Sequence, residues 1–193
     1  TSSVAGVAQT LTYRLATVTV KTADRTGVGK AGYLVRVFNG MGGSGAEWGN
    51  ATTNANGEAT FYLLEGDYGY RVDRAGAQSA KVGFAVIAHS DQSLSYTLAT
   101  ITVKTVDNMG VGKAGYLVRI FNDVDGSGTE WGNATTNANG EATFYLVEGS
   151  YGYRVDRAGA RSAKVGFSVA AHVDQTLTYT LAAVTIKVAD SAG

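Results

Sequence analysis

Residues 52–72 read TTNANGEATFYLLEGDYGYRV, and this stretch decides the fold. Strand-forming residues flank NANG (54–57) on both sides, and Asn and Gly tolerate positive φ, so the pattern predicts a tight β-hairpin turn. The segment EGD (65–67) is predicted to form a second turn. Strands are therefore expected over residues 58–64 and 68–73.

The same pattern of short strands extends outward from this stretch. Residues 16–22 (ATVTVKT) alternate apolar and polar, which places Val18, Val20 and Thr22 on one face and Lys21 on the other. About seven strands at short spacing predict a β-sandwich, with the remaining strands expected at 33–38, 47–53, 78–87 and 92–98. The expected core consists of Val18, Val20, Val35, Phe61, Leu63, Tyr68, Tyr70, Val72, Phe84, Leu94, Tyr96 and Leu98.

The composition agrees with an all-β chain and excludes several kinds of site. The 193 residues include 26 glycines, and charged residues make up only 17%. The formal net charge is zero, so nothing indicates electrostatic binding to nucleic acid or to an anionic membrane. There is no cysteine, which excludes a disulfide framework and a thiolate zinc site. No apolar run approaches the roughly 20 residues that a membrane-spanning helix needs.

An internal repeat dominates the chain. Residues 16–98 align without a gap on residues 99–181, and only 17 of the 83 positions differ. Each unit is therefore expected to form the same β-sandwich. Residues 1–15 match the C-terminal strand region of a preceding repeat, and residues 182–193 match the first strand of a following one. Two interpretations stay open: a window of a longer array, or a complete subunit whose terminal strands pair with neighbouring subunits.

The two repeats are joined without a linker. The last strand of the first repeat, SLSYTL (93–98), runs directly into the first strand of the second, ATITV (99–103). Flexible tethers between domains are rich in Gly, Ser or Pro, so their absence predicts a stiff joint. Stacked modules of this kind form a rod that lengthens by roughly 40 Å per module, given strands of ordinary length.

The order K-x-x-D-x-x-G, then VRVF, then TTNANGEATFYLLEGDYGYRV resembles the prealbumin-like β-sandwich modules of bacterial surface proteins, namely the Cna B-type and carboxypeptidase-regulatory-like repeats with Ig-like folds. The resemblance covers each 83-residue unit and implies an extracellular stalk or adhesin repeat. It also implies a candidate isopeptide bond from Lys21 to Asp91, and from Lys104 to Asp174. The alternation of 16–22 nevertheless places Lys21 on the outer face.

Three further sets of residues are candidate sites, each with a plainer alternative. Asp123, Asp125 and Ser127 follow the opening of a calcium loop, or form a solvated acidic loop. Asn50 and Asn133 fit the N-glycosylation pattern. Trp48 and Trp131 are candidates for a ligand platform that stacks on sugars, or they cover the open end of the core.

The sequence thus favours a structural module of an extracellular or cell-surface rod, stalk or filament that associates with copies of itself. The alternative is an adhesin module that binds carbohydrate or protein at the cell surface. No catalytic motif is present, so neither an enzyme nor a cofactor is predicted. Arg36 and Glu58 are expected to form an ion pair on the outer face rather than a catalytic pair.

Overall fold

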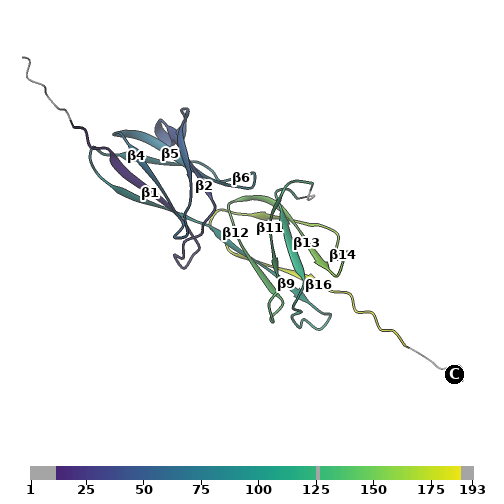
Figure 1. The fold of residues 1–193 in the computed structure, drawn as a ribbon. Coiled ribbons are helices and arrows are strands. Elements are labelled where there is room, and N and C mark those ends of the chain that lie inside the picture. The colour runs from purple at the N-terminus through teal and green to yellow at the C-terminus, as the bar shows by residue number, and fades with distance from the viewer. Residues whose placement is uncertain (1–11, 125–126, 188–193) are drawn as a thin grey trace, which may run out of the picture.

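The computed structural model of the chain describes residues 12–124 and 127–187. These residues form two β-sandwich modules that lie end to end (Figure 1). Each module packs a three-stranded sheet against a five-stranded sheet. The prediction of an all-β chain of tandem sandwiches is confirmed. No helix in the described part of the chain is long and apolar enough to span a membrane.

The first module contains strands β1 to β8. One sheet has the order β4-β1-β8, and the other has the order β3-β2-β5-β6 with β7 also paired to β5. A short 3₁₀ turn (Met41–Gly43) lies between β2 and β3. The strands are β1 (Ala16–Ala23), β2 (Leu34–Asn39), β3 (Glu47–Thr52), β4 (Glu58–Leu63), β5 (Gly66–Arg74), β6 (Ala77–Gln78), β7 (Val82–Val86) and β8 (Gln92–Thr97).

The second module repeats this arrangement with strands β9 to β16. Its sheets have the orders β12-β9-β16 and β11-β10-β13-β14, with β15 paired to β13. The strands are β9 (Ala99–Val106), β10 (Leu117–Phe121), β11 (Glu130–Thr135), β12 (Glu141–Leu146), β13 (Gly149–Arg157), β14 (Ala160–Arg161), β15 (Val165–Val169) and β16 (Gln175–Thr180).

The period-2 alternation predicted the core well, because it decides which face each side chain joins. Val18 and Val20 in β1 are fully buried, as is Thr22 on the same face. The Thr22 hydroxyl donates a hydrogen bond to the Lys30 carbonyl (2.7 Å), so this buried polar group is satisfied. Of the predicted core residues, only Phe84 and Leu94 are partly rather than fully buried, and both pack against the core.

The turn at residues 54–57 forms, but it does not close a β-hairpin as predicted. β3 pairs with β2 in one sheet, whereas β4 pairs with β1 in the other. The Asn54 carboxamide oxygen accepts hydrogen bonds from the amides of Asn56 (2.9 Å) and Glu58 (3.0 Å), and the chain crosses between sheets here. Local residue types therefore set the turn, and long-range pairing sets the partners of its flanking strands.

The single strand predicted over 78–87 is divided into β6 and β7. Between them, the Ser79 hydroxyl accepts a hydrogen bond from the Val72 amide (3.0 Å) and donates one to the Ala80 carbonyl (2.7 Å). These side-chain bonds replace part of the strand ladder, so the chain leaves the sheet between the two short strands.

The direction of the last strand determines how modules are joined. β8 runs parallel to β1, with Val18 opposite Gln92 and Ala23 opposite Thr97. The chain therefore enters a module at one end and leaves it at the other. We call the end where the first strand begins (Ala16 or Ala99) the top of a module, and the end where the last strand finishes (Thr97 or Thr180) the base.

Candidate functional site: the junction between the modules

A single residue, Leu98, separates β8 from β9. Leu98 is fully buried, and its amide donates to the Ala23 carbonyl (2.8 Å), which continues the β1–β8 ladder. Ala99 is also buried, and it pairs with Leu146 in the second module. Because both residues are held in a ladder and covered, the connection has no freely rotating hinge.

Two cations from the base of the first module lie over aromatic rings at the top of the second. The Lys30 ammonium is 3.7 Å from the centre of the Tyr145 ring. The Arg74 guanidinium lies over Trp131 (4.5 Å) and over Tyr33 of its own module (4.8 Å). Cation–π contacts of this kind contribute about 0.5–1 kcal/mol at exposed sites and about 2 when shielded from water. The Tyr33 hydroxyl also donates a hydrogen bond to the Tyr145 carbonyl.

Glu148, in the turn between β12 and β13, reaches into the base of the first module. Its carboxylate accepts hydrogen bonds from the Ala80 amide and from the Tyr96 hydroxyl. Burial, reinforced by the Glu148 carboxylate, raises the pKa of Tyr96 far above its usual range, so this phenol stays protonated and remains a donor.

Polar contacts complete the rim of the junction. The His172 ring lies edge-on to Tyr96, with 5.1 Å between ring centres. Arg25 approaches Asp174, with 4.0 Å between the guanidinium and the carboxylate. The Asn122 side-chain amide donates to the Ala75 carbonyl. The contact is therefore formed by several loops and strand ends on each side, and not by the chain connection alone.

The base of the first module is held in shape by its own electrostatics. Lys30 forms an ion pair with Asp24 (2.8 Å). The hydrogen bond from Lys30, with further hydrogen bonds from Thr26 and Val28, lowers the pKa of Asp24 from 3.8 to about 2. Burial raises the pKa of Tyr33 to about 12. At neutral pH, Asp24 is thus ionised and Tyr33 is neutral, as the contacts of Lys30 and Tyr33 require.

A groove of about 300 Å³ lies between the modules beside these contacts, and Lys30, Arg74, Trp131 and Tyr145 are among its lining residues. Its cations are already engaged by Asp24 and by aromatic rings. Within residues 12–124 and 127–187, no group of three or more His, Asp or Glu side chains could hold a metal ion. These charged and aromatic side chains thus hold the two modules together.

The structure does not bring the isopeptide candidates together. On β1, Lys21 lies opposite Glu58 on one side and Ser95 on the other. Asp91 instead accepts a hydrogen bond from the Thr17 amide (2.8 Å), four residues away from Lys21 along the strand, or about 13 Å.

The second module repeats this separation. Lys104 lies 3.7 Å from Glu141, and Asp174 accepts from the Thr100 amide (2.8 Å). Asp91 and Asp174 therefore bind the backbone at the start of β1 and β9, and neither contacts the lysine of that strand.

The calcium-loop candidates lie in the loop between β10 and β11. The Ser127 hydroxyl donates to the Asp123 carboxylate (2.9 Å), and Asp125 falls outside the described residues. The first repeat has Gly40 and Gly42 at the positions of Asp123 and Asp125, so any cation bound there is not a general property of the module.

The two glycosylation candidates, Asn50 and Asn133, are exposed. Each side-chain amide donates to a nearby glutamate, Glu47 or Glu130, at 2.7 Å. Asn133 also lines the groove between the modules.

The two tryptophans have different surroundings. Each packs edge-on against a core phenylalanine, Phe61 or Phe144. Trp131 is only 9% exposed, whereas Trp48 is 45% exposed. The difference arises from the junction, because Arg74 of the first module lies over Trp131.

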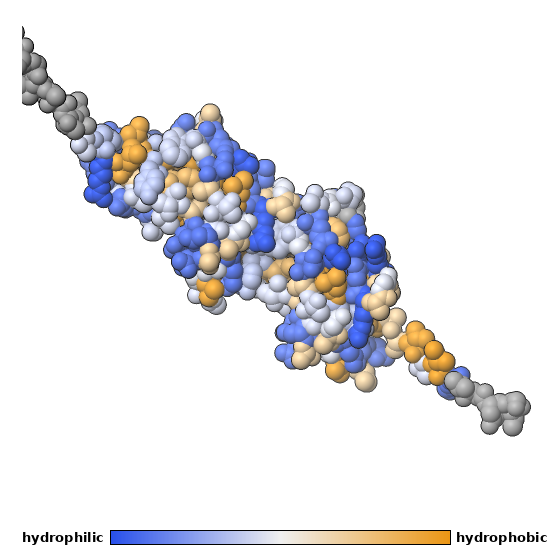
Figure 2. Space-filling model, viewed as in Figure 1, coloured by the Kyte–Doolittle hydropathy of each residue, from blue (hydrophilic) through white to orange (hydrophobic). Residues whose placement is uncertain are grey.

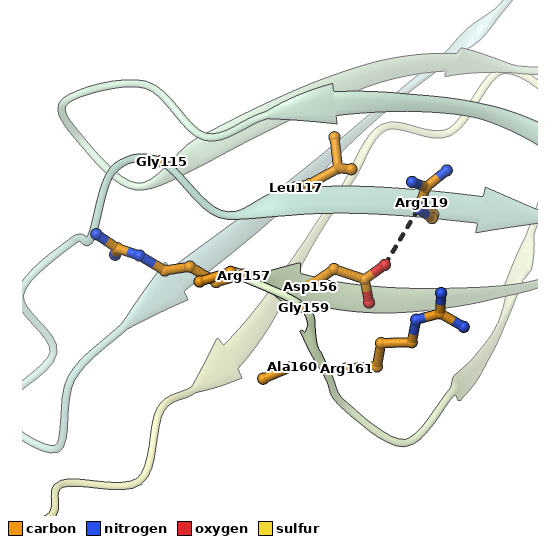
Figure 3. Close-up of a pocket in the computed structure, with 9 residues that line it drawn as sticks. Gly115, Leu117, Arg119, Asp156, Arg157, Gly159, Ala160 and Arg161 are labelled. Atoms are coloured by element: carbon orange, nitrogen blue, oxygen red, sulfur yellow. Dashed lines mark hydrogen bonds and ion pairs between the residues drawn. The ribbon is translucent and has the colours of Figure 1, made fainter.

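A second hollow, of about 260 Å³, lies on the outer face of the β10–β13 sheet (Figure 3). Arg119 pairs there with Asp156 (3.1 Å) and also with Glu130 (2.8 Å). The equivalent residue in the first module, Arg36, pairs with Glu47 and Asp73 (2.9 Å each). The predicted Arg36–Glu58 pair is therefore wrong, because Glu58 lies in the other sheet, opposite Lys21.

Sequence reasoning missed the residues that form the junction: Lys30, Tyr33, Arg74, Tyr145 and Glu148. The linkerless connection pointed to a stiff joint, but no local pattern distinguishes these cations and aromatics from other surface residues. The equivalent surface of the first module is recognised only in the structure, where the large side chains of Trp48, Tyr62 and Leu64 are 45 to 59% exposed.

No protein-family model and no curated protein matches the chain. Among solved structures, it is similar to the Bacillus anthracis TIE protein (19% identity, 87% of this chain and 34% of that one, TM-score 0.36). It is also similar to a streptococcal ancillary pilin (14% identity, 86% and 62%, TM-score 0.36). A third is the shaft pilin SpaA of Lactobacillus rhamnosus GG (14% identity, 91% and 100%, TM-score 0.37). The chain thus spans about a third of the first of these proteins and less than two thirds of the second.

Proposed function

We propose that the chain is a structural repeat of an extracellular or cell-surface rod, stalk or filament. The observation that carries this proposal is the junction, where a connection of one buried residue is reinforced by contacts from both modules. A chain that enters each module at the top and leaves at the base transmits tension along its length. The partners of such a module are further repeats of the same kind.

Small-angle X-ray scattering of the full chain tests the proposal. A rigid pair of end-to-end modules gives an elongated distance distribution with two peaks, and the profile stays the same in high salt if packing and hydrogen bonds hold the joint. A compact particle, or a profile that only a broad ensemble of inter-module angles can fit, would contradict the rod. Electron microscopy of longer arrays then measures the rise per module, expected to be roughly 40 Å.

A binding role at the top of the first module is the second candidate. Trp48 and Tyr62 are both large aromatics at this end, exposed by 45% and 59%. Exposed aromatic rings stack on sugars and are enriched in protein interfaces. A glycan array compared between the wild-type chain and Trp48→Ala tests this role, and equal binding by both would rule out a Trp48 platform.

A further inference from the structure

The two free ends of the molecule present the same surfaces that meet at the junction. At the top of the first module, Trp48 and Leu64 are 45% and 53% exposed. Their equivalents in the second module, Trp131 and Val147, are 9% and 1% exposed because the base of the first module covers them. The exposure of the upper face is thus what an uncovered half of this junction would show.

The base of the second module presents the other surface of this junction, again without a partner module covering it. Tyr33, Tyr96 and Leu98 are at most 3% exposed at the junction. Their equivalents Tyr116, Tyr179 and Leu181 are only partly buried, and they line an open hollow of about 210 Å³. At the junction, the corresponding place is where the Glu148 carboxylate meets Tyr96 and Ala80.

The cations at this base already have the geometry that the junction uses. Arg157 lies over Tyr116 (4.5 Å) and donates to the Ala114 carbonyl (3.2 Å), as Arg74 does to Tyr33 and Ala31. Figure 3 shows the Arg157 side chain pointing away from the Arg119–Asp156 pair. Lys113 pairs with Asp107 (2.7 Å), as Lys30 does with Asp24. The base of the second module is therefore preorganised to receive a Trp ring and a Tyr ring, the equivalents of Trp131 and Tyr145 at the internal junction.

The segment that leaves this base has the chemistry of a first strand without its module. Val184 and Ile186 are 84% and 83% exposed, and residues 182–187 form no β-strand. They align with Val18 and Val20 of β1, which are fully buried. Figure 2 shows this apolar segment extending from the second module into solvent. Alternating apolar residues at such exposure indicate a strand that is complete only when two neighbours pair with it.

We propose that the base of the second module docks the top of a further repeat of this sequence type, which takes residues 182–187 as its first strand. This inference rests on the proposed rod function and names its partner surface. The partner is a repeat attached in line and not a second intact copy, because an intact copy brings its own first strand and would compete for the place of residues 182–187. The ion pair of Arg25 with Asp174 is not reproduced there, since Asn108 occupies the equivalent position.

The test extends the full chain after Gly193 with the sequence of residues 28–98, so that residues 182–193 supply the first strand and its turn. Trp48→Phe and Trp131→Phe leave the appended tryptophan as the only one. Its quenching by iodide is expected to be about fivefold weaker than that of Trp48, the ratio of 45% to 9% exposure. Trp48 and Trp131 are measured singly in the unextended chain as references.

Two variants with the same substitution separate docking from folding. In the extended chain, Arg157→Ala should raise the quenching of the appended tryptophan towards the Trp48 value, whereas Arg74→Ala, at the internal junction, should leave it unchanged. An appended repeat that unfolds cooperatively but is quenched like Trp48 would overturn the proposal, and so would one that fails to fold on residues 182–193. If Trp48 of the unextended chain instead becomes protected as concentration rises, a second copy is the partner, and the in-line repeat is contradicted. Whatever the outcome, small-angle X-ray scattering from the unextended chain tests the proposed rod function independently of this docking proposal.

Discussion

At the residue scale, Thr22 and Thr53 show how buried hydroxyl groups position the junction. Both donate to the Lys30 carbonyl, at 2.7 and 3.0 Å, and Thr53 also accepts the Tyr33 amide (3.1 Å). These bonds fix the backbone on either side of two junction residues, Lys30 and Tyr33. The alternation in β1 predicted that Thr22 faces inward, but its acceptor lies in a loop that only the folded chain brings near.

Gly29 permits a close backbone approach at the same end of the module. A Cβ atom there would lie 1.8 Å from the Asn56 carbonyl oxygen, which belongs to the turn that crosses between sheets. Gly29→Ala should therefore destabilise the first module by about 3 kcal/mol, because the two backbones must separate. Hydrogen exchange of β1 and β9 amides in urea reports each module separately. Gly49→Ala is the control, since a Cβ at Gly49 meets nothing within 4 Å, and a loss similar to that of Gly29→Ala would contradict the steric account.

Asp24 should make the first module sensitive to acid. Its pKa is about 2 in the folded chain against an ordinary value of 3.8, chiefly because Lys30 hydrogen-bonds the carboxylate. A folded-state pKa below the unfolded one contributes stability that is fully present above about pH 4 and is lost as the pH falls through 2. The melting temperatures of wild type and Asp24→Asn should differ at pH 5 and converge towards pH 2. A gap that does not change over this range would show that the Lys30–Asp24 ion pair does not stabilise the fold.

At the element scale, the junction is formed by strand ends and not by strand interiors. The residue before β2 (Leu34–Asn39) supplies Tyr33, the last residue of β5 (Gly66–Arg74) supplies Arg74, and the turn between β12 and β13 supplies Glu148. Strand ends vary in length and direction more freely than the paired interior. The core of each sandwich can therefore satisfy its own packing while its ends carry the contacts between modules.

Tyr33 and Tyr116 offer a matched comparison at equivalent positions before β2 and β10. Tyr33 is buried and donates its hydroxyl hydrogen to the Tyr145 carbonyl across the junction. Tyr116 is partly exposed at the free base. Tyr33→Phe should lower the free energy of unfolding by about 1 kcal/mol, the usual net value of a hydrogen bond. Tyr116→Phe should change it by less than about 0.5 kcal/mol.

The comparison is measured by urea denaturation, with hydrogen exchange of the Leu98 and Ala99 amides as the local readout. Faster exchange at these two positions is expected in Tyr33→Phe alone. Equal losses in the two variants would show that the hydroxyl acts within its own module and not across the junction.

At the scale of the whole molecule, the parallel placement of β8 beside β1 determines the shape. A last strand that ran antiparallel to the first would return the chain to the top, and the next module would then lie alongside. Because β8 ends at the base, the second module follows in line (Figure 1). Stiffness then depends on the contacts around Leu98.

A flexible insertion at this point should separate stiffness from stability. Six residues, Gly-Ser-Gly-Ser-Gly-Ser, placed between Leu98 and Ala99 would move apart the Arg74–Trp131 and Lys30–Tyr145 contacts. Both modules should stay folded, while the scattering profile broadens and Trp131 becomes as accessible to iodide as Trp48. An insertion of the same six residues in the equivalent exposed turn at Gly110, at the base of the second module and away from this junction, is the control, and it should leave the accessibility of Trp131 and the angle between the modules unchanged. A chain that remained rigid with the insertion at Leu98 would show that the contacts re-form without the short connection.

The sequence by itself determined the repeat, its 83-residue period, the strands of the core and the absence of a linker. These features are local: a period of two places Val18, Val20 and Thr22 on one face whichever strands come to lie beside them. The tertiary structure decided which strands pair, so that β3 and β4 separate into two sheets across a turn predicted as a hairpin. It also decided the junction, where Tyr33 meets Tyr145, 112 residues further along the chain. Contacts at such separation depend on the closure of both sandwiches and on the direction of β8, and no local residue pattern encodes either.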